Sequence, residues 1–308
     1  MKEGIIIKST GNLYTVKCGN EPYITCRIKG KFRLEDFQAT NPVAVGDKVA
    51  FYIDIDEKTG IITEIFERKN HIIRKSTNLS KQTQILAANI DQSILLVTMD
   101  FPVTSTVFID RFIASAEAYN IPVILIFNKI DLYSDKNMDE MQNLINIYSN
   151  IGYQSISLST KNQENLDEIK ILLKDKTTLI SGHSGVGKST LINRLEPGLN
   201  LKTAEISTAH NTGKHITTFA EMHEFSFGGY IIDTPGIRGF GLTMMEKEEL
   251  YHFFREIFEI SAKCQYYNCT HIHEPGCAVK EAVSKNIIAE SRYHSYTSIY
   301  LNKDEKYR

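Results

Sequence analysis

A phosphate-binding pattern stands in the second half of the chain. Residues 180–190 read ISGHSGVGKST, with the pattern G-x-x-x-x-G-K-[ST] between an apolar run and the helix-like LINRL. Glycines let backbone N–H groups turn inward around phosphate oxygens, and the helix that follows adds its positive N-terminal end. In this pattern the lysine reaches the β- and γ-phosphates and the hydroxyl ligates Mg²⁺. The residues expected at the nucleotide are Gly182, His183, Ser184, Gly185, Val186, Gly187, Lys188, Ser189 and Thr190.

The tetrapeptide NKID predicts which base is bound. It ends a strongly apolar, strand-like run, so its side chains should project from the carboxyl edge of a sheet, where ligands bind. The Asp131 carboxylate can accept from the ring N–H and exocyclic amine of guanine, and adenine offers no matching donor pair. Asn128 can bond the other edge of the base, the Lys129 stem can cover the ring, and the Leu158 backbone N–H can reach the base oxygen. The expected base-binding residues are Asn128, Lys129, Asp131, Ser157, Leu158 and Ser159.

The sequence DTPG, from Asp233 to Gly236, follows the apolar run YII. Alone it is an ordinary turn sequence, but downstream of a phosphate loop it is the expected place for a Mg²⁺-linked aspartate and a γ-phosphate-sensing glycine amide. The next residue is Ile237, where many GTPases carry a glutamine that orients water. An aliphatic side chain cannot polarise water, so we expect slow intrinsic hydrolysis.

Another group must then position the attacking water. His215 in GKHITT is the local candidate for this catalytic role beside Lys188, and an exposed polar residue on a loop is an equally good interpretation of His215. Thr217 or Thr218 would be the switch residue that ligates Mg²⁺ and senses the γ-phosphate. The expected magnesium ligands, through the nucleotide, are Ser189, Thr217 and Asp233.

Three of the five cysteines share one short segment with histidines. An odd cysteine count without an export signal argues against a disulfide framework and favours a metal site. The spacing Cys264-x₄-Cys269-x-His271-x₅-Cys277 supplies a Cys₃His set suited to tetrahedral structural zinc, with His273 as a competing ligand. We expect Cys18 and Cys26, which stand apart, to be reduced, half-buried thiols.

The elements that must position these residues change in type along the chain. Residues 1–68 contain five short strand-like runs separated by turn residues, which favours a small β-barrel of the OB type. Residues 69–90 carry basic but no acidic side chains, and we expect an unpacked connector. From 91 to 243 apolar strands alternate with helical spacing, which predicts a mostly parallel sheet covered on both faces, with a hairpin around Gly228 and Gly229. Residues 244–308 predict helices interrupted by the Cys/His cluster.

The amino-acid composition limits how the chain can bind nucleic acids or membranes. The chain has 308 residues, 42% of them hydrophobic and 23% charged, and a net charge of −2, so nucleic-acid binding requires local basic patches. One candidate patch lies in the barrel, where a solvated strand face is as good an explanation as contact with phosphates and stacked bases. It comprises Arg27, Lys29, Lys31 and Arg33, near Phe32 and Phe37. With no signal peptide and no membrane-length apolar run, we expect a cytoplasmic protein, a monomer, without membrane association.

The order of the motifs is unusual. In ordinary P-loop GTPases NKxD follows the phosphate loop, whereas here NKID precedes it by about fifty residues. Circular permutation explains this order, because joining the old termini and opening the chain elsewhere preserves the sheet. Lys174, Asp175 and Lys176 form a plausible new junction.

With this order, the chain resembles the ribosome small-subunit-dependent GTPases of the RsgA, or YjeQ, type. The resemblance covers essentially the whole chain, and its sharpest marks are GHSGVGKST, GKHITTF, DTPGIRGF and CQYYNCTHIHEPGCAV. It implies an N-terminal OB-fold, a circularly permuted GTPase domain and a helical zinc domain. It also selects Cys264, Cys269, His271 and Cys277 as the zinc ligands. Ile216 interrupts the family's usual run of threonines, which leaves the choice between Thr217 and Thr218 open.

The resemblance further implies the partners: GTP and GDP with Mg²⁺, one structural Zn²⁺, and the small ribosomal subunit with its rRNA. Members hydrolyse GTP slowly alone and faster on the subunit during its late maturation. Two alternatives stay open, a permuted GTPase that serves another ribosomal particle and an RNA-binding scaffold that holds nucleotide without useful turnover. Because DTPGIRGF leads directly into the C-terminal region, we also expect γ-phosphate loss to shift that region and promote release.

Overall fold

The computed structural model describes residues 1–28, 42–54, 59–75, 83–201, 220–233 and 246–302. They form two compact units that interleave along the sequence. The first unit comprises Met1–Ile94, Asn165–Ser181 and Lys188–Gly241, and the second comprises Leu95–Glu164, Gly182–Gly187 and Leu242–Arg308. Among the described residues, we find no helix with the length and apolar character needed to span a membrane.

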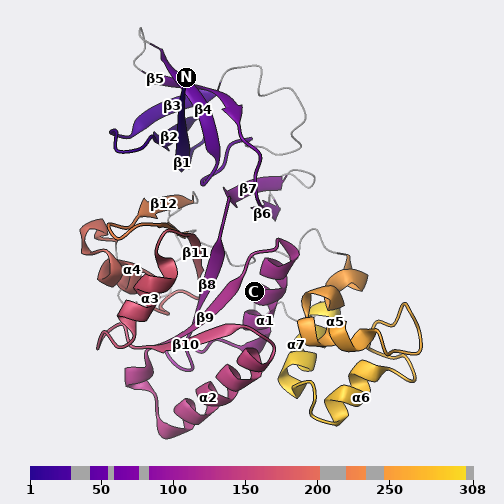
Figure 1. The fold of residues 1–308 in the computed structure, drawn as a ribbon. Coiled ribbons are helices and arrows are strands. Elements are labelled where there is room, and N and C mark those ends of the chain that lie inside the picture. The colour runs from indigo at the N-terminus through magenta and orange to yellow at the C-terminus, as the bar shows by residue number, and fades with distance from the viewer. Residues whose placement is uncertain (29–41, 55–58, 76–82, 202–219, 234–245, 303–308) are drawn as a thin grey trace, which may run out of the picture. The chain divides into compact units, whose positions relative to one another are not determined.

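The first unit begins with the expected five-stranded barrel (Figure 1). Its strands are β1 (Lys2–Thr10), β2 (Leu13–Lys17), β3 (Ile24–Ile28), β4 (Lys48–Asp54) and β5 (Thr59–Ile65), in the order β1-β2-β3-β5-β4. Pairing of β4 with β1 closes the barrel. Alternating side chains fill its interior, including Tyr14, Val16, Cys26 and Phe51. Both barrel cysteines are free thiols, Cys18 half-buried and Cys26 buried.

Between the barrel and the next strands lies a packed hairpin, where we expected an unpacked connector. Strands β6 (His71–Lys75) and β7 (Thr83–Ala88) pair antiparallel, and Ile72, Ile85 and Ala87 are buried. The expectation was wrong because it followed the basic charges. The short apolar runs on the two sides of the charged stretch were the better guide.

The rest of the first unit carries the strand that ends at Asp233. Parallel strands β11 (Thr177–Ser181) and β13 (Tyr230–Asp233) pair Ile180 with Asp233, and β12 (Glu221–Glu224) returns antiparallel to β13. Gly228 and Gly229 form the predicted hairpin turn with positive φ. Helices α3 (Leu166–Leu173) and α4 (Lys188–Leu195), with the short η3 (Pro197–Leu199), belong to the same unit. On its outer edge β12 pairs with barrel strand β1, Lys8 opposite Glu221.

The second unit carries the NKID segment and the C-terminal helices. Strand β8 (Gln92–Val97) enters it from the first unit, and β9 (Val123–Asn128) pairs parallel with β10 (Gln154–Leu158). Both β8 and β9 are wholly buried, which accounts for the apolar runs ILLV and VILIF within them. Helices α1 (Thr106–Ala118) and α2 (Asp135–Asn150) begin at the side-chain caps Ser105 and Ser134.

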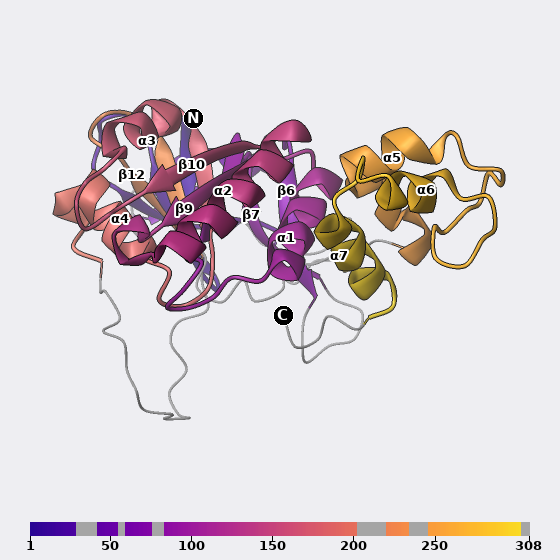
Figure 2. The ribbon, with the colours of Figure 1, turned by 90° about the horizontal axis from the view of Figure 1, so that it is seen from below.

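The C-terminal region consists of η4 (Lys247–Phe253), α5 (Arg255–Ser261), α6 (Ala278–Ser284) and α7 (Glu290–Tyr300). Helix α7 lies beside α1, as Figures 1 and 2 both show. One apolar cluster joins Val107 and Ala114 of α1 to Phe254, Ile257 and Tyr296 of this region. Within the second unit, the C-terminal region is therefore packed against α1 rather than tethered to it.

Candidate functional site

The NKID segment is tied to the phosphate loop within the second unit. The Asn128 side chain is 1% exposed, and its Nδ2 donates to the Val186 carbonyl oxygen over 2.8 Å. Its Oδ1 accepts from the Thr160 hydroxyl at 2.6 Å and the Thr160 backbone N–H at 3.3 Å. These bonds fix the end of β9 against the loop. They use one of the two Nδ2 hydrogens, so the expected contact of Asn128 with a base edge stays a prediction.

The Asp131 carboxylate, which we expect to bind guanine, is also held in place. Ser159, fully buried, donates through its hydroxyl to Asp131 Oδ1 over 2.7 Å and accepts from the Asn162 N–H. Lys129 has a left-handed backbone with φ of +67°, and its ammonium donates to the Phe101 carbonyl oxygen. Burial lowers the pKa of Lys129, and the Asp131 charge partly restores it. The Asp131 carboxylate keeps acceptor capacity beyond the single serine bond, as guanine recognition requires.

Glycines in the phosphate loop are required by space as well as by backbone angle. Gly182 and Gly187 have φ of +142° and +103°, which side chains rarely adopt. A Cβ at Gly187 would lie 2.5 Å from Asn128 Nδ2, and one at Gly182 would lie 2.7 Å from the Leu96 carbonyl oxygen. His183, the first variable position, stacks on Phe108 with ring centroids 3.9 Å apart. The loop is thus fitted closely to β8, β9 and α1 of its own unit.

Two residues of this network did not emerge from the sequence. Thr160 holds Asn128, and the Tyr133 hydroxyl donates to the Asn128 carbonyl oxygen at 2.6 Å while accepting from the Met99 N–H at 2.9 Å. Burial raises the pKa of Tyr133 to about 12, so it stays protonated. Thr160 directly follows the SLS segment, and extending that motif by one residue would have included it.

The residues expected at the reacting phosphate belong to the first unit. Lys188 begins α4, and Asp233 ends β13 opposite Ile180. Burial lowers the pKa of Lys188 and Asp233 raises it, while burial raises the pKa of Asp233 and Lys188 lowers it. The two groups therefore interact as opposite charges in a partly desolvated place. Ser189 is half-buried and Thr190 exposed on the same helix. The remaining candidates lie outside the described residues: His215, Thr217, Thr218, Gly236 and Ile237.

The predicted metal ligands come together in the C-terminal region. The ligand atoms of Cys264, Cys269, His271 and Cys277 all lie within 4.8 Å of one another. Cys264 Sγ is 3.9 Å from Cys277 Sγ and 3.6 Å from His271 Nδ1, and Cys277 Sγ is 3.5 Å from the same nitrogen. A tetrahedral zinc with bonds of about 2.3 Å to sulfur and about 2.0 Å to nitrogen requires edges of about 3.5–3.8 Å. The donor set fits such an ion.

Hydrogen bonds fix the loop that carries His271. The Glu274 carboxylate accepts from the backbone N–H groups of Thr270, Ile272 and His273 and from the Thr270 hydroxyl. Although burial raises its pKa, the hydrogen bonds beginning with those from Thr270 lower it to about 2. Tyr293 donates to the His271 carbonyl oxygen at 2.7 Å. His273, the competing ligand, is exposed and lies outside the cluster.

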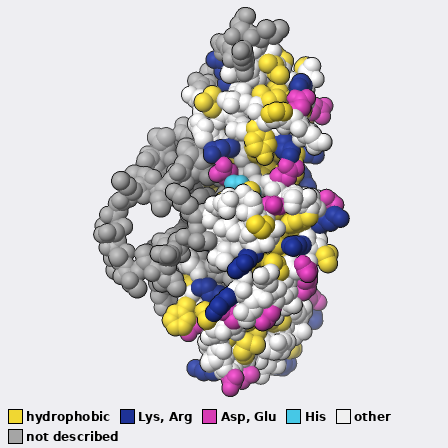
Figure 3. Space-filling model, turned by 90° about the vertical axis from the view of Figure 1, so that its left-hand side faces the viewer, with side chains coloured by type: hydrophobic (Ala, Val, Ile, Leu, Met, Phe, Trp, Pro, Cys, Tyr) yellow, Lys and Arg dark blue, Asp and Glu magenta, His cyan; other side chains and the backbone are white. Residues whose placement is uncertain are grey.

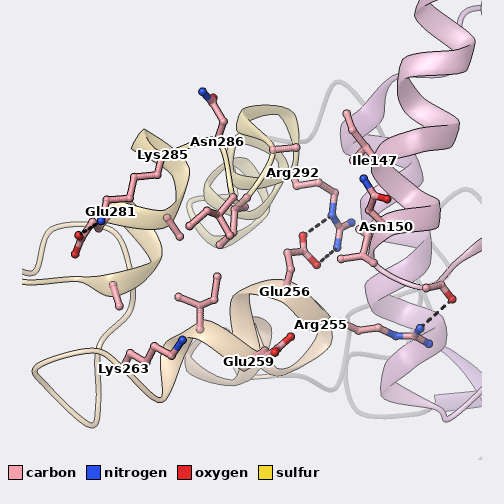
Figure 4. Close-up of a pocket in the computed structure, with 18 residues that line it drawn as sticks. Ile147, Asn150, Arg255, Glu256, Glu259, Lys263, Glu281, Lys285, Asn286 and Arg292 are labelled. Carbon is pink, nitrogen blue, oxygen red and sulfur yellow. Dashed lines mark hydrogen bonds and ion pairs between the residues drawn. The ribbon is translucent and has the colours of Figure 1, made fainter.

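A buried ion network holds the C-terminal region on α1. Arg292 of α7 donates to Asp110 Oδ1 at 2.6 Å and to the two Glu256 oxygens at 2.7 and 3.1 Å. Tyr148 of α2 also donates to Asp110. Figure 4 shows Arg292 reaching Glu256 beside a pocket of about 900 Å³ between the end of α2 and the C-terminal helices. Two ion pairs lie within its wall, Lys285 with Glu281 and Arg292 with Glu256.

Comparisons with known proteins agree with this geometry. The family model described as RsgA GTPase matches residues 65–243, and that of the RsgA N-terminal domain matches residues 3–62. Two relatives are the small ribosomal subunit biogenesis GTPase RsgA 2 of Bacteroides thetaiotaomicron, 56% identical over 99% of both chains, and RsgA of Flavobacterium psychrophilum, 51% identical over 99% of this chain and 94% of that one.

Solved structures show the same likeness. The crystal structure of YjeQ from Thermotoga maritima matches with a TM-score of 0.80 and 35% identity, covering 98% of both chains. A structure titled as YloQ, a circularly permuted GTPase, matches with a TM-score of 0.76 and 34% identity over 99% of this chain and 96% of the other. Nearly the whole chain thus shares its architecture with solved structures, one of which is titled a circularly permuted GTPase.

Proposed function

The chain belongs to the RsgA GTPase family, and from this premise we propose that it is an assembly factor that hydrolyses GTP on the small ribosomal subunit during late maturation. Its membership makes it a circularly permuted GTPase. The observation that carries the proposal is the Asn128–Val186 hydrogen bond, which joins the base-reading segment to the phosphate loop although their order is reversed in the chain. The part of the proposal that names the small ribosomal subunit rests on the names of the relatives.

Within this function, each group has a task that its surroundings support. Asp131 accepts from guanine while Ser159 aligns it, and the loop amides from Gly182 to Gly187 surround the phosphates. Lys188 neutralises charge on the β- and γ-phosphates. Ser189, Asp233 and Thr217 would hold Mg²⁺, which stabilises the developing negative charge when GTP is bound. We keep His215 as the proposed water-positioning group.

We propose zinc for the C-terminal cluster. Four protein ligands leave no open coordination position, so the ion would stabilise the fold of the segment from Cys264 to Cys277 and take no part in hydrolysis. Cys₃His is a soft donor set that disfavours Mg²⁺ and Ca²⁺. We further propose a monomer that works in the cytoplasm, where small subunits mature, and that contacts rRNA through the barrel. On the face shown in Figure 3, acidic and basic side chains of described residues are interspersed, so any basic contact there is local.

Phosphate release from GTP separates the candidate functions. We expect slow release by the chain alone and strong stimulation by purified small ribosomal subunits. Stimulation only by large subunits would indicate another particle, and no stimulation by either would indicate a scaffold that merely holds nucleotide.

Base recognition has its own test. Asp131→Asn should weaken GTP binding and favour xanthosine triphosphate, because an amide can donate to the xanthine 2-oxo group where a carboxylate cannot. Asp139→Asn, an exposed change on α2, is the matched control and should bind GTP like the unaltered chain. Equal GTP affinity of both variants would contradict the assignment of Asp131.

A further inference from the structure

The loop between the first two metal ligands carries exposed aromatic side chains. Residues Gln265, Tyr266, Tyr267 and Asn268 separate Cys264 from Cys269 and are all exposed. The Tyr267 side chain is 97% exposed and that of Tyr266 is 43% exposed. Within the described part of the chain, the Tyr267 ring takes part in no hydrogen bond or ring contact. An aromatic ring left this far in water contributes nothing to folding by burial.

The loop is nevertheless anchored at both ends. Cys264 and Cys269 contribute sulfur atoms to the metal cluster, the Cys269 N–H donates to the Tyr266 carbonyl oxygen at 3.2 Å, and the Gln265 N–H donates to the Gly276 carbonyl oxygen at 3.5 Å. A short loop closed by a metal loses little additional backbone entropy when a ligand binds. The tyrosines are therefore presented by a preorganised support.

We propose that Tyr267, assisted by Tyr266, is a stacking platform for unpaired bases of small-subunit rRNA. The inference rests on the proposed function, which supplies the RNA-rich particle. Base stacking on aromatic side chains is the usual way in which proteins hold single-stranded RNA, and it tolerates any base.

The chemistry around the rings favours RNA over a protein partner. Between Ile260 and His273 no acidic residue occurs, whereas Lys263 and His273 are exposed. The tyrosines' neighbours Gln265 and Asn268 carry amides, which can bond base edges, rather than the apolar side chains that surround a tyrosine at a protein interface. A cluster of three thiolates around Zn²⁺ and one neutral histidine carries one negative charge. This contact should therefore depend on stacking and little on phosphate attraction.

The first measurement uses the full, zinc-loaded chain with a non-hydrolysable GTP analogue and purified small ribosomal subunits. Tyr267→Ala should raise the dissociation constant about 5- to 150-fold, the range that corresponds to the loss of one stacked base. Tyr267→Phe keeps the ring and should bind like the unaltered chain. Ile287→Ala removes an exposed side chain of the same region outside the loop and should also change nothing. Tyr267→Ala should leave the slope of affinity against salt unchanged.

The second measurement identifies what covers the ring. The chain contains no tryptophan, so Tyr267→Trp places a single reporter at this position. Small subunits, and a single-stranded RNA octamer at higher concentration, should quench its emission through stacking. Unchanged subunit affinity of Tyr267→Ala overturns the proposal. A second result also overturns it: Tyr267→Ala binds the subunit more weakly, but no RNA quenches the emission of Tyr267→Trp, and Tyr267→Trp crosslinks to a ribosomal protein. Either result leaves subunit-stimulated hydrolysis intact, whereas failure of the proposed function would show as no stimulation of the unaltered chain.

Discussion

Replacing Arg292 tests whether buried charge holds the C-terminal region in place. The side chains of Arg292 and Asp110 are 1% and 0% exposed, and that of Glu256 is 12% exposed. Arg292→Met keeps much of the volume but removes all three hydrogen bonds to these carboxylates. Breaking a buried ion pair by removing one partner costs about 3–5 kcal/mol, because the other charge stays buried and unpaired. We expect a loss of this size in the stability of α7 against α1.

The cost should depend on pH with a definite sign. Burial raises the pKa of Asp110 and Arg292 lowers it, so the substitution raises that pKa further. A carboxyl whose pKa is higher in the folded state binds its proton more tightly there than in the unfolded chain. Stability is then greatest at low pH and falls as the pH rises through the folded-state pKa. The penalty of Arg292→Met should therefore be larger at pH 8 than at pH 5.5.

Region-resolved hydrogen exchange is the suitable assay, because a chain with several domains does not unfold in one step. Peptides from α7 and α1 should lose protection in Arg292→Met, while those from the barrel strands keep it. Adding Asp110→Asn to Arg292→Met removes the buried carboxylate that has lost its partner, and it should restore part of the protection against hydrogen exchange. Arg194→Met, at an exposed arginine of α4, should change stability by less than about 0.5 kcal/mol.

Two results would refute the reasoning. Unchanged exchange of α7 in Arg292→Met would show that apolar packing alone fixes this helix, and an equal penalty at both pH values would show that Asp110 is not the stranded charge. The outcome also bears on the expected switch. If the network is as costly to break as we infer, GTP hydrolysis would move the C-terminal region together with α1 rather than away from it.

Three further predictions concern the two sites. Gly187→Ala should raise the dissociation constant for GTP at least about 30-fold, because strain at positive φ and the clash with Asn128 each cost about 1–3 kcal/mol. The control is Gly11→Ala, at a position with positive φ but no neighbour within 4 Å, and it should leave GTP affinity unchanged. Calorimetric titration with GTP compares the two variants. Thr160→Val should weaken GTP binding about tenfold in the same titration by leaving Asn128 Oδ1 without its hydroxyl donor, and full affinity would mean that the bonds to Val186 and to the residue 160 backbone N–H suffice to hold Asn128. Glu274→Gln should speed zinc loss to a chelating dye about 10- to 100-fold, since an amide NH₂ would face backbone donors, whereas His273→Ala should retain zinc.

The sequence predicted those parts that depend on local pattern. Short strand-like runs between turn residues marked the barrel strands, and apolar runs marked β8 and β9, because each pattern reflects a local constraint. The spacing of cysteines and histidines marked the Cys₃His cluster, and the family resemblance chose His271 over His273. The hydrogen bonds of Asn128 within the protein could not be read in this way. They join it to Val186, 58 residues later, and to Thr160, which lies just after β10. The pattern around Arg292 gave no sign of its ion pair for the same reason, because its partner Asp110 is 182 residues away.

The pairing of β1 with β12 has a consequence for dissecting the protein. A strand at the edge of a sheet exposes unpaired backbone groups and invites self-association, and here the barrel shields the outer side of β12. Ion pairs from Lys8 to Glu221 and from Lys17 to Glu224 lie along the same seam. Removing the N-terminal barrel would expose the unpaired edge of β12, which pairs on its other side with β13, the strand that ends at Asp233. A truncated protein should therefore tend to aggregate, and its lost activity would say little about what the barrel recognises.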